Sequence, residues 1–425
     1  MAIHRIIPVS SGKGGVGKTT FAVNFCLALA RHGRTVLIDL DTGTSSVRNA
    51  IDTPVAKDLY HFFRKGARLD ECVTPLSDRL DPGGRYRNFG FVAGPMHLIE
   101  EITNFGPDKK AQIIDAINGL NADWIVLDLK AGLDSSVLDF LPFHNSGILV
   151  FTPHMPAATM AASDIVKAIL FRKLRLIFSK DSPFYEIVED RSGFWKLVND
   201  LIDQAEDVYD PSLHNLDAFA DDLHRSLGEH PVTTTVLNTL HYFKVHSVLN
   251  LFNGVDDSFE TAVRPFVENL TENVTNRCTI LNLGWINRSN TIHQANCRRV
   301  PAFLLEPEKK EKKVDRIAQE LEDLRVTAIG LEPRTPRIRK IAATPPGDLS
   351  PPSLDHLDEQ LRVLKTMFTH RREDDHRANF EYMAQRALFT MRGHSSRDLG
   401  DTRILRPHEA LSQLFQRTTG LGSKN

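Results

Sequence analysis

The glycine-rich run at residues 10–20, SSGKGGVGKTT, constrains the fold of this chain more than any other segment. It satisfies the pattern G-x-x-x-x-G-K-[ST]. The fixed positions of that pattern are Gly12, Gly17, Lys18 and Thr19. The apolar residues 3–9 before the run predict a buried strand, and the apolar residues 21–30 after it predict a buried helix. A strand, a glycine loop and a helix in this order can enclose phosphate groups, so the chain is predicted to begin with such a unit.

The residue types in this loop predict that it binds a nucleotide triphosphate. Glycines let successive backbone N–H groups turn toward phosphate oxygens, because no Cβ blocks the approach. The positive end of the following helix points at the same anion. Lys18 is expected to reach the β- and γ-phosphates, and the Thr19 hydroxyl to bind Mg²⁺. The predicted nucleotide-binding residues of the loop are Gly12, Lys13, Gly14, Gly15, Val16, Gly17, Lys18, Thr19 and Thr20.

Lys13 is a second lysine within the loop. Two ammonium groups this close repel each other unless a polyanion lies between them. The run KGGVGKTT resembles the deviant Walker A motif of the MinD/ParA family of dimerising ATPases, nearest its MinD- and FlhG-like branch. The resemblance implies ATP and Mg²⁺ as cofactors and a homodimer joined by ATP. It also implies two catalytic lysines: Lys18, which binds the phosphates in its own subunit, and Lys13, which reaches the phosphates bound by the other subunit. The alternative is a solvated lysine on the rim of the loop.

A strand that ends in two carboxylates, TVLIDLDTG at residues 35–43, resembles the family's D-x-D-x-G switch I segment. By this match Asp39 lies near Mg²⁺, and Asp41 orients the water that attacks the γ-phosphate. Positioning and charge neutralisation are what phosphoryl transfer chiefly requires. The alternative is a turn that uses Asp41 for backbone geometry only.

A second strand ends in a carboxylate within DWIVLDLKAG at residues 123–132. Asp128 resembles the family's Walker B carboxylate, which holds Mg²⁺, and Gly132 resembles the switch II glycine whose N–H faces the γ-phosphate. Lys130 departs from the family, which has a small residue or proline there. This long cation is expected to contact phosphate, pair with an acid or alter the switch, and it bears on the rate of hydrolysis more than on binding.

Composition and charge are those of an enzyme-sized cytoplasmic protein. The chain has 425 residues and a formal net charge of −2, which provides no general attraction to nucleic acid or anionic membranes. No apolar run reaches the length of about 18 residues that spans a membrane, and the first residues lack a secretion signal. The cysteines are scattered and form no C-x-x-C pair, which fits a reducing compartment and argues against an iron–sulfur carrier.

Strands alternate with helices from the start of the chain, and strands resume at residues 245–252 and 279–283, which predicts an α/β fold. The family resemblance covers about residues 1–178 and 244–328. We expect a mostly parallel twisted sheet with helices on both faces, as in P-loop NTPases, and a ligand at the carboxyl ends of the strands. The predicted ATPase domain is residues 1–330, with a helical insertion at 180–241. An apolar face of that insertion is predicted to contain Phe194, Trp195, Leu197, Leu201 and Ile202. Asn250, at a strand end, resembles the family's adenine-reading residue, although a core or turn asparagine fits equally well.

The remaining residues are predicted to form a proline-rich linker at 331–352 and a helical extension at 353–425. Apolar stripes over 354–368 and 380–388 predict a helical hairpin that packs on the ATPase domain, a partner or itself. The segment 409–421 resembles the short amphipathic helix with which MinD-like proteins contact membranes. Its apolar face is short and its basic face thin, so peripheral contact with the inner face of the cell membrane is one alternative, and DNA contact is less favoured.

We therefore expect an ATP-binding, slowly hydrolysing switch that positions or regulates a cellular assembly and is stimulated by an unidentified protein partner. The alternatives are a ParA-like ATPase that partitions DNA or cargo, and a scaffold that binds ATP without hydrolysing it. The cargo is not encoded in these motifs.

Overall fold

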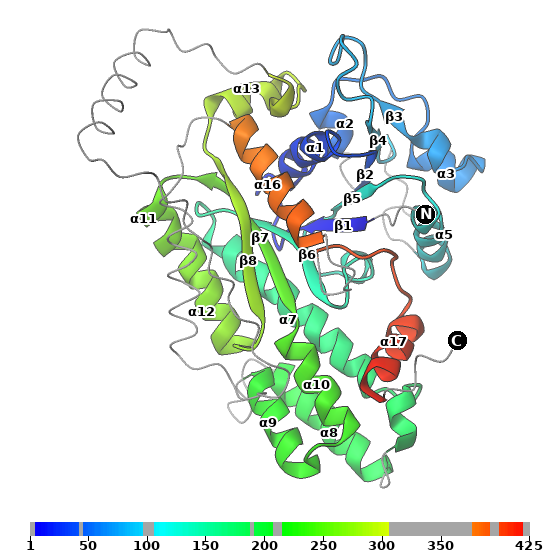
Figure 1. The fold of residues 1–425 in the computed structure, drawn as a ribbon, viewed down its shortest axis with the longest axis vertical. Coiled ribbons are helices and arrows are strands. Elements are labelled where there is room, and N and C mark those ends of the chain that lie inside the picture. The colour runs from blue at the N-terminus through cyan, green and yellow to red at the C-terminus, as the bar shows by residue number, and fades with distance from the viewer. Residues whose placement is uncertain are drawn as a thin grey trace, which may run out of the picture. The chain divides into compact units, whose positions relative to one another are not determined.

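An eight-stranded sheet lies at the centre of the chain (Figure 1). The computed structural model describes residues 5–41, 46–96, 106–187, 191–206, 215–305, 376–391 and 399–419. The strands are β1 Arg5–Ser10, β2 Thr35–Leu40, β3 Thr74–Pro75, β4 Phe89–Val92, β5 Trp124–Leu129, β6 Asn145–Phe151, β7 Lys244–Phe252 and β8 Thr279–Asn287. They are ordered β3-β4-β2-β5-β1-β6-β7-β8 in the sheet. Among the strands of the described residues, β3 alone pairs in the antiparallel direction, with β4, so the predicted mostly parallel sheet is confirmed.

The central strands are short, apolar and buried along their whole length, which is the pattern of a parallel sheet covered on both faces. The helices of the first half are α1 Lys18–Leu29, α2 Ser46–Ala50, α3 Leu59–Lys65, α5 Pro107–Asn118, α6 Ser135–Leu138 and α7 Pro156–Ile177. Those of the second half are α8 Arg191–Glu206, α9 Leu216–Leu227, α10 Pro231–His241, α11 Val255–Ser258, α12 Arg264–Asn273, α13 Asn290–Cys297, α16 His376–Met391 and α17 Pro407–Thr419. Short 3-10 turns lie at η1 Asp70–Cys72, η2 Pro183–Ile187 and η4 Ala302–Leu304, and a π turn at η3 Phe259–Val263.

Helices α8, α9 and α10 lie together within the predicted insertion, next to the long helix α7 (Figure 1). Trp195 and Ile202 of α8 are buried as predicted, but Leu197 is 57% exposed, so its predicted place on the apolar face is wrong. Val198 is buried instead, because positions 195, 198 and 202 fall on one stripe of a helix with 3.6 residues per turn.

Helix α16 covers the edge of the sheet from a distant part of the chain. It packs against β8 and α1, and its buried side includes Phe380, Met383 and Ala384. Gly284 of β8 has φ +152°, and a Cβ at this position would lie 2.6 Å from Met383 Cγ. The glycine therefore lets the helix approach the strand closely. The other stripe of the predicted hairpin, at 354–368, and the predicted linker lie outside the described residues.

The C-terminal region also pairs with the first strand. Asp401 forms an antiparallel bridge with Ile6: Ile6 N donates to Asp401 O at 2.7 Å, and Asp401 N donates to Ile6 O at 3.0 Å. A guanidinium nitrogen of Arg5 donates to the carbonyl of Met391, the last residue of α16, at 3.4 Å.

Helix α17 begins soon after this bridge and packs against α10, η2 and α7. Ala410 and Leu411 are buried there, and the ring of Phe415 lies edge-on to Phe184 with centroids 5.4 Å apart. Within the described residues, no helix has the length and apolar character required to cross a membrane.

We predict that α16 contributes to the stability of the core. Phe380 is fully buried, whereas Phe389 on the same helix is 75% exposed. Phe380→Ala is expected to lower the free energy of unfolding by about 3–5 kcal/mol, because it removes a buried ring and leaves a cavity. Phe389→Ala is the matched control and should change it little. Denaturant unfolding of the whole chain measures both values, and equal effects would show that α16 does not pack as described.

Candidate functional site at the glycine-rich loop

The glycine-rich loop connects β1 to α1 at the carboxyl edge of the parallel sheet, where ligands of such sheets bind. Gly15 and Gly17 have φ of +81° and +85°, a left-handed conformation that glycine adopts without strain. Gly17 immediately precedes α1, and a Cβ there would lie 2.1 Å from Asn250 Nδ2. Glycine is therefore required at this position for both its conformation and its small volume.

A cavity of about 770 Å³ opens above the loop. The predicted residues that line it are Gly14, Gly15, Val16, Gly17, Lys18, Thr19, Thr20, Asp41 and Asn250. The facing wall comes from the end of β8 and the first turns of α13, and includes Arg288, Ser289, His293 and Asn296. The volume falls within the range typical of small-molecule sites.

Lys18 and Thr19 both donate to the carboxylate of Asp128. Lys18 Nζ lies 2.6 Å from Asp128 Oδ1, and Thr19 Oγ1 lies 2.7 Å from Asp128 Oδ2. Lys18 is 6% exposed and Asp128 is fully buried, so each charge needs the other. These two contacts join the glycine-rich loop and the start of α1 to the carboxylate on β5.

Asp39 lies beside Asp128, because the two residues are paired in the register of β2 and β5. Its carboxylate accepts hydrogen bonds from Val47 N at 3.0 Å and Asp41 N at 3.2 Å. Burial and the neighbouring Asp128 nevertheless raise the pKa of Asp39 to about 7. Two adjacent buried carboxylates with a single lysine favour the arrival of further positive charge.

The oxygen atoms at this point suit Mg²⁺. Thr19, Asp39 and Asp128 offer a hydroxyl and two carboxylates, which are the ligand types that this ion takes. No group of three or more His, Cys, Asp or Glu side chains able to hold a metal occurs among the described residues. Mg²⁺ commonly completes its shell with waters and substrate phosphates, so this donor set fits the ion when a nucleotide is bound with it.

Asp41 lines the cavity one residue beyond the end of β2. The rest of the predicted switch I segment, residues 42–45, lies outside the described residues. Helix α2 then begins at Ser46, whose hydroxyl lies 3.3 Å from Asp128 Oδ2 and 3.4 Å from Asp39 Oδ1. Ser46 was not predicted, and its only signal in the sequence is a hydroxyl residue soon after the paired carboxylates.

Lys13 differs from Lys18 in its surroundings. It is exposed and does not line the cavity. It lies near Asp164 of α7, where it and Lys167 oppose the increase that burial causes in the pKa of that carboxyl. The neighbouring Gly12 is pressed against α7, since a Cβ there would lie 2.4 Å from Ala161. The structure thus directs the two loop lysines to different places.

The switch II segment contacts the glycine-rich loop. Gly132 N donates to Ser11 O at 2.9 Å, so this N–H is bound to the loop backbone. The place of Gly132 near a γ-phosphate stays a prediction. Its φ of +108° lets the backbone turn back in this way. Lys130 Nζ pairs with Asp134 Oδ2 at 3.2 Å, which matches the acid-pairing alternative.

Asn250 contacts the loop. Its Nδ2 donates to Val16 O at 2.7 Å, and the side chain is 6% exposed. Leu251, the next residue, has φ +57°, an uncommon conformation for a bulky side chain, and sits at a break in the β7–β8 register. The local strain accompanies the turn of Asn250 toward the loop. An adenine-reading role for Asn250 stays a prediction.

The cavity wall formed by β8 and α13 was not predicted residue by residue. Ser289 caps α13 by accepting hydrogen bonds from Thr291 N and Ile292 N, which fixes the start of this helix beside the loop. Asn296 Nδ2 donates to Thr20 Oγ1 at 3.2 Å. The sequence indicates these residues only by their position, since they follow β8, whose carboxyl end lies at the same edge of the sheet as the glycine-rich loop.

Comparisons with known proteins place this site in a family. The pattern of the CobQ/CobB/MinD/ParA nucleotide binding domain matches residues 7–286, more than half of the chain. A putative septum site-determining protein MinD from Nephroselmis olivacea is 28% identical over 184 residues, which are 42% of this chain and 64% of that protein. MinD of Escherichia coli K12 is 28% identical over 185 residues, 43% of this chain and 64% of the relative.

The chloroplastic minD homolog of Arabidopsis thaliana is 30% identical over 159 residues, 36% of this chain and 47% of its own. The chain therefore spans about half to two thirds of the length of these curated relatives. Among solved structures, MinD from Pyrococcus horikoshii OT3, complexed with Mg-ADP, aligns over 77% of this chain and 100% of its own with a TM-score of 0.43 and 16% identity.

The matched region begins in β1 and ends in β8. It contains the glycine-rich loop, the two paired carboxylates and the strand that carries Asn250. The resemblance stated from the loop motif is confirmed: this chain belongs to the CobQ/CobB/MinD/ParA family of nucleotide-binding domains.

Proposed function

We propose that the protein is a Mg²⁺-dependent ATPase that dimerises around ATP and uses hydrolysis to end that state. The observation that carries the proposal is the contrast between the two loop lysines. Lys18 is buried on Asp128 at the floor of the cavity, whereas Lys13 is exposed outside it. A lysine that leaves its own cavity while sharing its loop can serve a triphosphate held by a second copy of the chain.

The residues of the site divide the chemistry among them. Lys18 and the loop N–H groups bind and neutralise the phosphates, and Thr19, Asp39 and Asp128 hold Mg²⁺, which supplies charge neutralisation when bound. Asp41, at the cavity wall, orients the attacking water. Lys13 of the partner copy adds a further positive charge where negative charge develops during transfer.

The conformation of switch II supports slow hydrolysis without a partner. Gly132 N–H is bound to Ser11, and Lys130 is paired with Asp134. Both contacts have to rearrange before this segment can face a γ-phosphate. We propose that an activating protein partner favours the rearranged state, which makes the protein a switch.

The cellular role is proposed from the curated relatives, which are named for determining the site of the septum. We propose that this protein likewise positions or regulates an assembly in the cytoplasm. Membrane contact through α17 would require the helix to leave its present position, because Leu411 is buried and Phe415 packs on Phe184.

A ParA-like role on DNA has less support. Such a role requires a basic patch, for which Arg298, Arg299 and the basic run at 334–340 are the candidates in the sequence. Arg299 donates to the carbonyl of Arg48 at 2.9 Å and pairs with Asp52. The basic run at 334–340 lies outside the described residues. The scaffold alternative is decided by measuring hydrolysis directly.

We predict that the two loop lysines have separable roles. Lys13→Ala should abolish ATP-dependent dimerisation while nucleotide affinity changes less than about tenfold, and Lys18→Ala should weaken nucleotide binding at least about tenfold, since it removes a charge-assisted contact to phosphate. Sedimentation with Mg-ATP measures assembly, and a fluorescent nucleotide measures affinity. Lys65→Ala, an exposed lysine of α3, is the control. A Lys13→Ala protein that still dimerises would disprove the cross-subunit role.

We also predict that Asp41 is required for hydrolysis. Asp41→Ala should lower the rate of phosphate release about a hundredfold, the usual scale for losing a group that positions and polarises water, and leave nucleotide affinity nearly unchanged. Asp78→Ala, an exposed aspartate outside the cavity, is the control. If the unaltered chain releases no phosphate with ATP and Mg²⁺, alone or with a cell extract added, the scaffold alternative replaces this proposal.

A further inference from the structure

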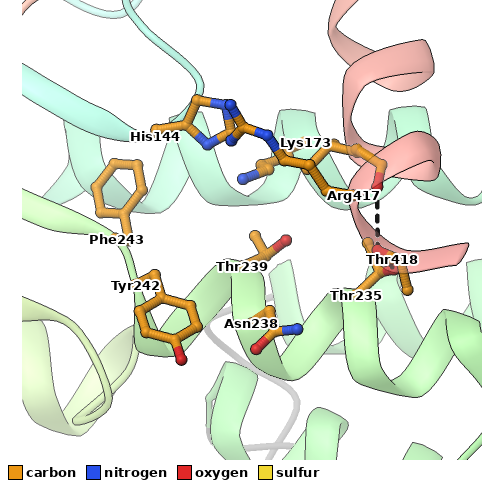
Figure 2. Close-up of a pocket in the computed structure, with 10 residues that line it drawn as sticks. His144, Lys173, Thr235, Asn238, Thr239, Tyr242, Phe243, Arg417 and Thr418 are labelled. Carbon is orange, nitrogen blue, oxygen red and sulfur yellow. Dashed lines mark hydrogen bonds between the residues drawn. The ribbon is translucent and has the colours of Figure 1, made fainter. Parts of the chain in front are cut away.

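A small cavity lies at the edge of the sheet opposite the glycine-rich loop. His144 and Phe243 line it immediately before β6 and β7 begin, whereas the loop follows the end of β1. Helices α7, α10 and α17 complete the wall (Figure 2). The volume is about 90 Å³, which is about three waters at the volume that a water takes in the liquid, so a small ion fits and a nucleotide does not.

The cavity is rich in hydrogen-bond donors and positive charge. In Figure 2 the nitrogen-bearing side chains of His144, Lys173 and Arg417 lie along one side, and Thr239 and Asn238 of α10 face them. Lys173 is 2% exposed, and its Nζ donates a hydrogen bond to Phe143 O at 3.1 Å. A buried ammonium group and a guanidinium beside one cavity are a typical environment for an oxyanion.

The hydroxyl of Thr239 is a second observation that favours a ligand in this cavity. Thr239 is 3% exposed, and no partner for its Oγ1 is found in the described part of the chain. Thr235, one turn earlier on α10, donates to Pro231 O at 2.8 Å and lies 2.7 Å from Thr418 Oγ1. A buried hydroxyl without a hydrogen-bond partner costs about 1–3 kcal/mol of stability, and a ligand oxygen that accepts from Thr239 would remove this cost.

One carboxyl competes for the cations. Burial raises the pKa of Asp401 to about 7, although Arg5, Arg417 and Lys173 all oppose this increase. At neutral pH a large fraction of this carboxyl is therefore protonated. Part of the positive charge beside the cavity remains available to an anion.

We propose that this cavity binds a tetrahedral oxyanion of the size of phosphate, either free or as the terminal group of a small ester. Its oxygens accept from Lys173, Arg417 and the hydroxyl of Thr239. Since Arg417 belongs to α17 and Lys173 to α7, the anion joins the C-terminal helix to the rest of the fold. The proposal is independent of the function proposed above.

Equilibrium dialysis of the full chain against labelled inorganic phosphate tests it. A saturating non-hydrolysable ATP analogue with Mg²⁺ occupies the glycine-rich loop, so that phosphate binding there is excluded. We expect one phosphate per chain. Thr239→Val and Arg417→Gln should each weaken this binding about tenfold, because each removes a hydrogen-bond donor to the anion.

Thr233→Val is the matched control. Thr233 lies on the same helix, is 1% exposed and also has an Oγ1 without a partner among the described residues, but it does not line the cavity. Its phosphate affinity should equal that of the unaltered chain. A repeat with glycerol phosphate identifies the source: tighter binding of the ester assigns the site to a phosphate monoester, and equal or weaker binding assigns it to the free ion.

Two results would overturn the proposal. Absence of phosphate binding beyond the nucleotide site would mean that water alone fills the cavity. Unchanged affinity in Thr239→Val and Arg417→Gln, or an equal loss in Thr233→Val, would place the binding elsewhere.

Discussion

The buried contact of Lys18 with Asp128 is the interaction on which the rest of the site depends. Asp128 is paired in register with Asp39, and one lysine serves two adjacent buried carboxylates. Without that cation, burial and the mutual repulsion of the two carboxylates would favour their protonated forms, which bind a metal ion poorly. The same shortage of positive charge makes the site receptive to a divalent cation. The loop, both strands and the start of α1 are arranged around this requirement.

Much of the fold could be predicted from the sequence because its signals are local. The predicted strand segment at residues 35–43 contains β2, and the one at residues 123–132 contains β5. The loop residues are recognisable because their spacing creates the turn that holds phosphate. Asn250 and Ser46 are different, since no local pattern shows which backbone a side chain will meet across the sheet. Their contacts follow from strand register and a break in it.

For the C-terminal helices too, the sequence could not predict the packing partner. An apolar stripe indicates that a helix face will be buried, but it does not identify the surface that buries it. The stripe at 380–388 packs on β8 and α1, a destination that depends on Gly284 lacking a side chain. The segment that resembles a membrane-contacting helix places Phe415 on Phe184 within the fold. Periodicity cannot distinguish a protein surface from a lipid surface, because both reward burial of the same apolar area.

The bridge between Ile6 and Asp401 has a consequence for biosynthesis. A ribosome delivers residue 6 long before residue 401. The backbone of β1 at Ile6 therefore stays without this partner until residue 401 has been synthesised. Full pairing of the strand that leads into the glycine-rich loop thus waits for a segment that is distant in the sequence. A chain that ends before residue 401 would lack the pairing of Ile6 with Asp401, and its exposed strand backbone would be a target for chaperones and proteases.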